Sequence, residues 1–155
     1  MTNCGTAMIT SRKPGGTIAI IKSTAFDFEG PNGSFDESLP PGQSFAAFLE
    51  QRLIACGARL VSKQVPGEEG WSFDVELHAR VYRFFIHWAP IGDPPSDRWI
   101  IQTSICKGLL HSLVGGATIE RDVSTVLDIL HQQMSNASEI EEITWITNEE
   151  FSELY

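Results

Sequence analysis

The chain has 155 residues and a hydrophobic fraction of 42%, which is ordinary for a globular protein and predicts one domain with a sizeable core. No apolar run approaches the roughly 18 residues that span a bilayer, which argues against a membrane-spanning segment. The formal net charge of −9 repels phosphates and anionic lipids, so nucleic acids and membranes are poor candidate partners.

Residues 1–16 end in Pro14-Gly15-Gly16 and are predicted to form a flexible arm, which leaves 17–155 as a single domain. The arm lacks the continuous apolar stretch of a secretory signal. Three widely spaced cysteines without a CxxC pattern are typical of reduced thiols and argue against a zinc site. We therefore expect a cytoplasmic protein.

The first half of the chain predicts a strand, a long loop, a helix and a second strand. Residues 17–23 are apolar and β-branched, as in a strand, and residues 26–42 are dense in Gly, Pro, Asp and Ser, as in a loop. Ser44 is the expected N-cap of a helix over about 44–56, and residues 59–65 read as a short strand. One face of that helix collects apolar side chains at helical spacing: Phe45, Phe48, Leu49, Leu53 and Cys56.

Residues 71–106 are predicted to form an antiparallel β-meander. Large apolar side chains alternate with polar ones along 71–77 and again along 82–88, which is the period of a strand with one buried face. A loop rich in proline and aspartate, 90–97, then leads into a third strand over 98–106. The aromatic face of this meander is expected to be core.

The alternation also suggests how the first two strands of the meander pair. A reversal around Ala79-Arg80 places aromatic and aliphatic residues opposite one another on one face. On the other face it pairs Glu76 with Arg83 and Ser72 with His87. A four-residue turn would keep the same register.

The last third of the chain predicts a helix over about 118–135, a strand over 140–146 and a short helix over 148–155. The longer helix carries an apolar stripe: Ile119, Val123, Val126, Leu127, Leu130 and Met134. The expected fold class is α+β, an antiparallel β-sheet built on the meander of about 71–106 with the two main helices packed mainly on one face.

No segment carries a specific catalytic, metal or cofactor motif. Ser72, His87 and Asp74 share a strand face, but no GxSxG elbow or oxyanion hole accompanies them. His78 and His87 lie at opposite ends of the expected hairpin, which argues against a shared metal. Gly115-Gly116 precedes a helix, yet no Lys-Ser/Thr follows it. We therefore expect no enzyme activity, no catalytic residues, no metal and no cofactor.

The outer face of the hairpin is the better candidate for function, because Val81 and Phe85 lie there among charges, with Ile100 available from the third strand. Apolar side chains in that setting predict a partly covered face, either by the N-terminal segment or by another chain, or a protein-binding site. The candidate partner-binding residues are Asp74, Glu76, Arg83, Phe85, His87, Asp93 and Asp97. Residues 139–155 add six acids and no lysine or arginine, so the expected partner is a basic protein.

In size, acidity and order of elements the chain resembles bacterial immunity proteins, and its helix-meander-helix order is similar to that of acidic secretion chaperones. The resemblance implies a module that binds a protein and catalyses nothing. Two alternatives stay open: a small-ligand-binding protein or enzyme with a pocket between the sheet and the 26–42 loop, and a structural homodimer joined through the sheet.

Overall fold

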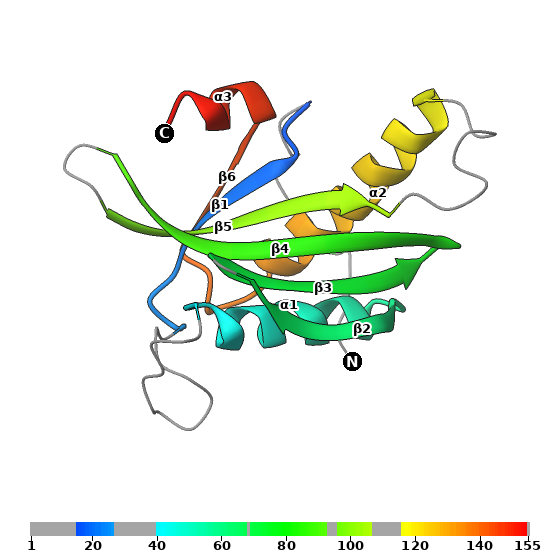
Figure 1. Cartoon of the computed structure of the whole chain (residues 1–155), viewed down its shortest axis with the longest axis horizontal. Helices are drawn as coiled ribbons and strands as arrows, with labels where there is room; N and C mark the ends of the chain where they lie inside the picture. The colour runs from blue at the N-terminus through cyan, green and yellow to red at the C-terminus, as the bar shows by residue number, and fades with distance from the viewer. Residues whose placement is uncertain (1–14, 27–39, 68, 93–95, 107–115, 155) are drawn as a thin grey trace.

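A computed structural model describes residues 15–26, 40–67, 69–92, 96–106 and 116–154. It is a six-stranded antiparallel sheet with three helices, which confirms the predicted α+β class (Figure 1). The predicted N-terminal arm up to residue 14 and the stretch 27–39 of the predicted loop lie outside the described residues.

The sheet is a four-stranded meander extended by two strands from the ends of the chain. Its spatial order is β2-β3-β4-β5-β1-β6, so β1 inserts between β5 and β6. The meander strands are β2 (Arg59–Pro66), β3 (Gly70–Leu77), β4 (Arg80–Ile91) and β5 (Ser96–Ile105). The added strands are β1 (Ile18–Lys22) and β6 (Glu142–Ile146), both predicted from their apolar composition.

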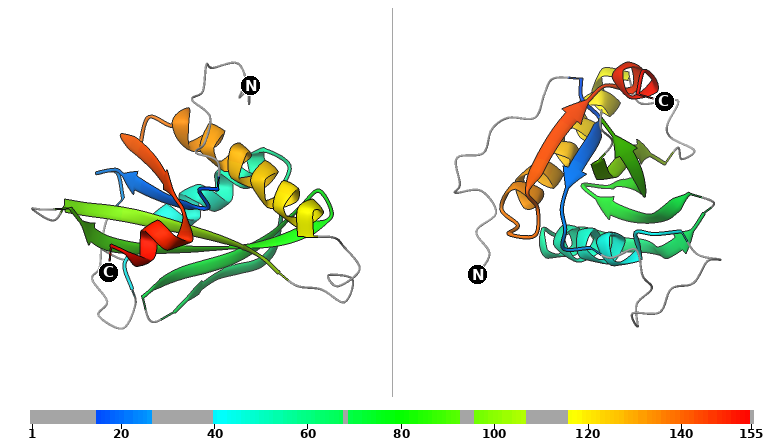
Figure 2. Two further views of the ribbon diagram at one scale, coloured as in Figure 1. Left: turned by 90° about the horizontal axis from the view of Figure 1, so that it is seen from above. Right: turned by 90° about the vertical axis from the view of Figure 1, so that its left-hand side faces the viewer.

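The two main helices, α1 (Gln43–Ala55) and α2 (Gly116–Ser135), pack on the aromatic face of the sheet. A short helix, α3 (Asn148–Ser152), packs on the opposite face (Figure 2). Both main helices therefore lie on one face, as predicted. None of the described helices combines the length and apolar character needed to cross a membrane.

The core between the sheet and α1 and α2 is strongly aromatic. Phe73 of β3 stacks on Phe84 of β4 with ring centroids 5.5 Å apart. Phe45 of α1 meets Trp99 of β5 edge-on at 5.6 Å and stacks on Phe26 at 4.6 Å. Each fully buried ring of this kind stabilises the fold by about 1.5–3 kcal/mol. The expectation that the aromatic face is core is confirmed.

Both N-caps differ from the predicted ones. Gly42, not Ser44, precedes α1; it has a φ of 118° and provides no side-chain cap. A Cβ there would lie 3.2 Å from the Trp99 ring, so the glycine suits both the backbone and the packing. Thr147, not Asn148, caps α3 through a reciprocal capping box with Glu150, whose two hydrogen bonds are both 3.1 Å.

The hairpin of β3 and β4 reverses at His78-Ala79, one residue earlier than predicted. Both residues have positive φ, 52° and 64°, as in the tight primed turns that match the twist of paired strands. The predicted register is therefore wrong by two residues: Asp74 lies opposite Arg83, where Glu76 was expected. A shift of two preserves the faces, so the predicted assignment of residues to the two faces remains correct.

Candidate functional site

The outer face of the sheet is the side that turns away from α1 and α2. Alternate residues of the central hairpin point to it: Ser72, Asp74 and Glu76 from β3, and Val81, Arg83, Phe85 and His87 from β4. Ser72 lies opposite Phe85, and His87 lies opposite Gly70, so the predicted pair of Ser72 and His87 is not formed. The serine, histidine and aspartate thus do not make the contacts of a catalytic triad.

Two ion pairs neutralise the acids on this face. The guanidinium of Arg83 donates two hydrogen bonds to Asp74, of 2.8 and 3.0 Å. These bonds and the carboxylate charge raise the pKa of Arg83. Arg59 of β2 forms an ion pair with Glu76, 3.2 Å apart, and donates one hydrogen bond of 3.3 Å to it. Since both carboxylates already have a cationic partner, the middle of the outer face attracts a basic protein only weakly.

His87 is buried on the outer face although it is titratable. Its ring stacks on Phe85, with centroids 5.1 Å apart, and meets Phe151 of α3 edge-on at 6.1 Å. Burial lowers the pKa of His87, and the nearby charge of Glu69 opposes this only in part. The imidazole is therefore held neutral and serves as packing between the sheet and α3.

The short helix α3 covers part of the outer face of the sheet. Phe151 and the partly buried Ile91 pack on a second apolar cluster made of Ile18, Ile20, Ala89, Ile100 and Ile146. The cover comes from the C-terminal helix, whereas the N-terminal segment or another chain was expected. It reaches β4 only at the end of the strand that holds His87 and Ala89, so Phe85 and Val81 stay half-exposed beyond its edge.

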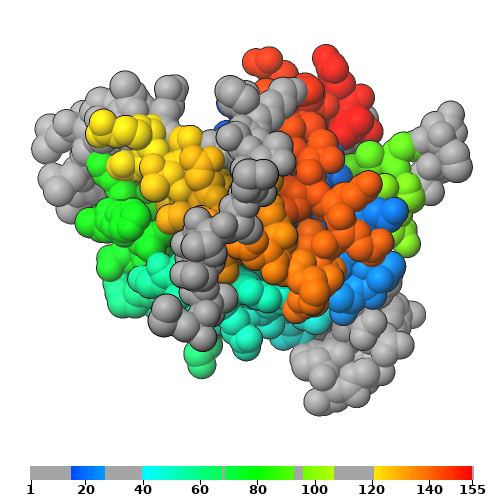
Figure 3. Space-filling model, turned by 180° about the vertical axis from the view of Figure 1, so that it is seen from behind, coloured from blue at the N-terminus to red at the C-terminus, as the bar shows by residue number. Residues whose placement is uncertain are grey.

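The C-terminal end of the chain holds four exposed acids, one of which, Glu142, lies opposite Lys22 of β1 in the sheet. Glu141 and Glu142 lie at the start of β6, and Glu149 and Glu153 lie in and directly after α3; we call these four the acidic strip. All four are exposed, and none makes an ion pair with another described residue. The segment from the end of α2 through α3, orange to red in Figure 3, forms a band across one face of the molecule.

The other acids of this end are already engaged. Glu139 lies 4.0 Å from Arg52 of α1, and Glu150 is held in the capping box. Of the two loop acids in the predicted partner-binding set, Asp97 is exposed on β5, and Asp93 lies outside the described residues.

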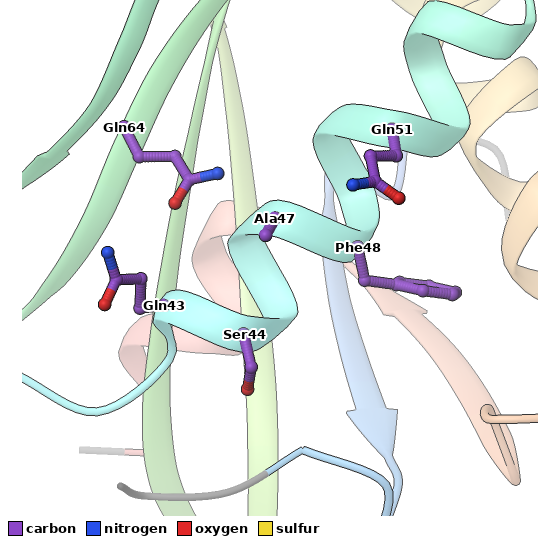
Figure 4. A pocket seen from close by; sticks show the side chains of 6 residues that line it. All are labelled: Gln43, Ser44, Ala47, Phe48, Gln51 and Gln64. Carbon is purple, nitrogen blue, oxygen red and sulfur yellow. The ribbon is translucent and has the colours of Figure 1, made fainter. Parts of the chain in front are cut away.

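A groove of about 440 Å³ lies between α1 and β2, on the helix side of the sheet (Figure 4). It is lined by Gln43, Ser44, Ala47, Phe48, Gln51 and Gln64. The predicted alternative placed a pocket between the sheet and the 26–42 loop. Asp74, Glu76 and His87 lie on the opposite face, so they do not converge on this groove.

The described part of the chain contains no cluster of three or more side chains of the types that bind metals. His78 is exposed in the hairpin turn, while His87 is buried at the far end of the hairpin. Sequence reasoning identified the acidic C-terminal segment as a candidate binding surface but missed that Phe151 connects it through His87 to Phe85. Only the run of acids after residue 138 signalled this segment. No protein-family model, curated protein or solved structure matches this chain.

Proposed function

We propose that the chain is a cytoplasmic protein-binding module without catalytic activity, which holds a basic protein partner on the acidic strip and the adjoining edge of the outer face. The observation that supports this proposal most directly is the series of ring contacts from Phe85 through His87 to Phe151. It joins a half-exposed aromatic ring to the helix that presents Glu149 and Glu153.

The chemistry of this surface supports a protein partner. Exposed like charges repel one another, and a basic surface relieves that repulsion while a nucleic acid or an anionic membrane increases it. A half-exposed aromatic side chain beside charges is typical of the anchor of an interface. The partner-binding residues predicted on the outer face keep this role in the proposal, and Phe85, Glu76 and the guanidinium of Arg83 are the ones that reach solvent.

The test compares two variants that lose the same charge. The double variant Glu149→Gln/Glu153→Gln neutralises α3, and Asp122→Asn/Asp128→Asn removes the same charge from α2, on the other face of the sheet. Immobilised chains are exposed to cell lysate, and the retained proteins are identified and titrated. Two exposed ion pairs contribute up to about 1 kcal/mol each, so the first variant should bind a retained basic protein more weakly, by up to about thirtyfold. Equal retention by both variants, or retention of acidic proteins alone, would contradict the proposal.

A homodimer joined through the outer face is a second candidate, favoured by one observation. The two ion pairs give this face as many bases as acids, so two copies can meet there without net repulsion. Light scattering over a range of concentrations tests it, and a monomer mass throughout would remove it.

A further inference from the structure

The short helix α3 depends on one aromatic side chain for its place on the outer face of the sheet (Figure 2). None of its five residues is fully buried. Asn148, Glu149 and Ser152 are exposed, and the half-buried Phe151 packs on the apolar cluster beneath the helix. A helix of five residues is too short to be stable alone, so its helical form depends on this packing.

The backbone hydrogen bonds that close the turns of α3 join residues of the same segment. The amide of Phe151 donates to the carbonyl of Thr147 at 3.0 Å, and the amide of Leu154 donates to the carbonyl of Phe151 at 3.1 Å. The capping box likewise joins Thr147 to Glu150. Movement of α3 away from the sheet therefore breaks none of these bonds.

The strand before α3 is held independently of it. β6 pairs with β1 along its whole length, and Trp145 is buried in the core on the opposite face. The indole of Trp145 also donates a 2.9 Å hydrogen bond to His131 of α2. One residue, Thr147, connects β6 to α3, and its backbone is extended, with a φ of −82° and a ψ of 165°. Rotation at Thr147 can therefore move α3 while β6 stays in the sheet.

The side chains beneath α3 are apolar and closed off from water. His87 lies at their edge and is 7% exposed, between the rings of Phe85 and Phe151. The cluster itself consists of Ile18, Ile20, Ala89, Ile100 and Ile146. We propose that α3 is a hinged cover that opens about Thr147 while the sheet stays folded, and that its opening uncovers this cluster and the ring of His87.

The packing of one ring favours the closed position of α3 far less than the core favours the folded domain. Full burial of a phenylalanine favours the buried form by about 10- to 150-fold, and Phe151 is only half-buried. A small domain favours its folded form by about 10³- to 10⁸-fold. The cover therefore opens many times for each time that the domain unfolds.

Opening also divides the surface to which the proposed function assigns a partner. Glu149 and Glu153 move with α3, whereas Phe85 stays on β4. The closed form presents the acids together with the sheet, and the open form presents an apolar site on the sheet alone. The inference rests on the packing of α3 and does not depend on a partner.

The test measures how fast diethyl pyrocarbonate modifies each histidine of the full chain at constant pH, with the modified peptides located by mass spectrometry. The exposed His78 calibrates the reagent. In the wild type, His87 should react at a rate that stays within about twofold as urea is raised below the unfolding transition, because opening of α3 exposes little surface. Phe151→Ala should raise this rate by about tenfold or more. The rate of His131 should stay within about twofold, because β6 does not move.

Leu154→Ala is the matched control, since Leu154 is an exposed apolar residue of the same segment. It should leave the rate of His87 within about twofold, and thermal unfolding verifies that both variants fold. Three results would overturn the inference. They are a wild-type His87 that reacts only as urea unfolds the domain, a rate of His87 that Phe151→Ala leaves unchanged, and a rate of His131 that rises together with that of His87 in Phe151→Ala.

Discussion

Replacing Asp74 by asparagine and Arg83 by glutamine, singly and together, measures how strongly the two side chains interact across β3 and β4. The pair is bidentate, with hydrogen bonds of 2.8 and 3.0 Å. The side chain of Asp74 is 11% exposed and that of Arg83 is 56% exposed, so water screens one partner and not the other. The interaction should therefore lie at the upper end of the range for exposed pairs, about 1 kcal/mol.

The two single substitutions should differ. Arg83→Gln leaves a buried carboxylate without its cation, which should cost about 1–2 kcal/mol. Asp74→Asn leaves a guanidinium that water already solvates, so it should cost less. Urea unfolding followed by tryptophan fluorescence gives the four free energies. The reasoning fails if the coupling is absent, or if an equal coupling is found between Glu76 and Arg83, the pair that the predicted register would form.

Three further predictions concern the hairpin and the residues beside it. Ala79→Gly removes a Cβ from a residue with a φ of 64°, so it should stabilise the protein by about 0.5–1 kcal/mol and raise the melting temperature by roughly 2–4 °C; a lower melting temperature would contradict the primed turn. Gly70→Ala would place a Cβ against the carbonyl oxygen of Ile86, so urea unfolding should show a loss of about 3 kcal/mol, and a neutral result would contradict this close approach of β3 and β4. Burial lowers the pKa of His87, so on acidification the unfolded chain binds a proton at a higher pH than the folded chain does. The stability is therefore full above the ordinary histidine pKa of about 6.5 and should fall as the pH drops below it. His87→Phe should flatten that dependence, and an unchanged slope in the variant would assign it to another group.

The faces of the sheet could be read from the sequence because strand side chains alternate with a period of two. The register could not, because it depends on the turn, and His78-Ala79 lacks the Asn-Gly signature that marks a primed turn. The pairing of β3 with β4 overrides the intrinsic cost of positive φ at these two residues.

The packing of α3 on the outer face could not be predicted from the sequence either. It depends on Phe151, a single aromatic residue in a short acidic segment, contacting His87 more than sixty positions earlier. Local periodicity carries no signal for such a contact. The acids of the same segment were visible as a charge run, but the link from Phe151 through His87 to Phe85 follows only from how α3 packs.

The most direct test of the proposed function is an NMR titration of the isotope-labelled full chain with a basic protein that it retains. The account predicts that signals of Glu149, Glu153 and Phe85 change with the amount of partner added, and that salt reverses these changes. Changes confined to elements away from α3 and the outer face, or changes that salt does not affect, would contradict it.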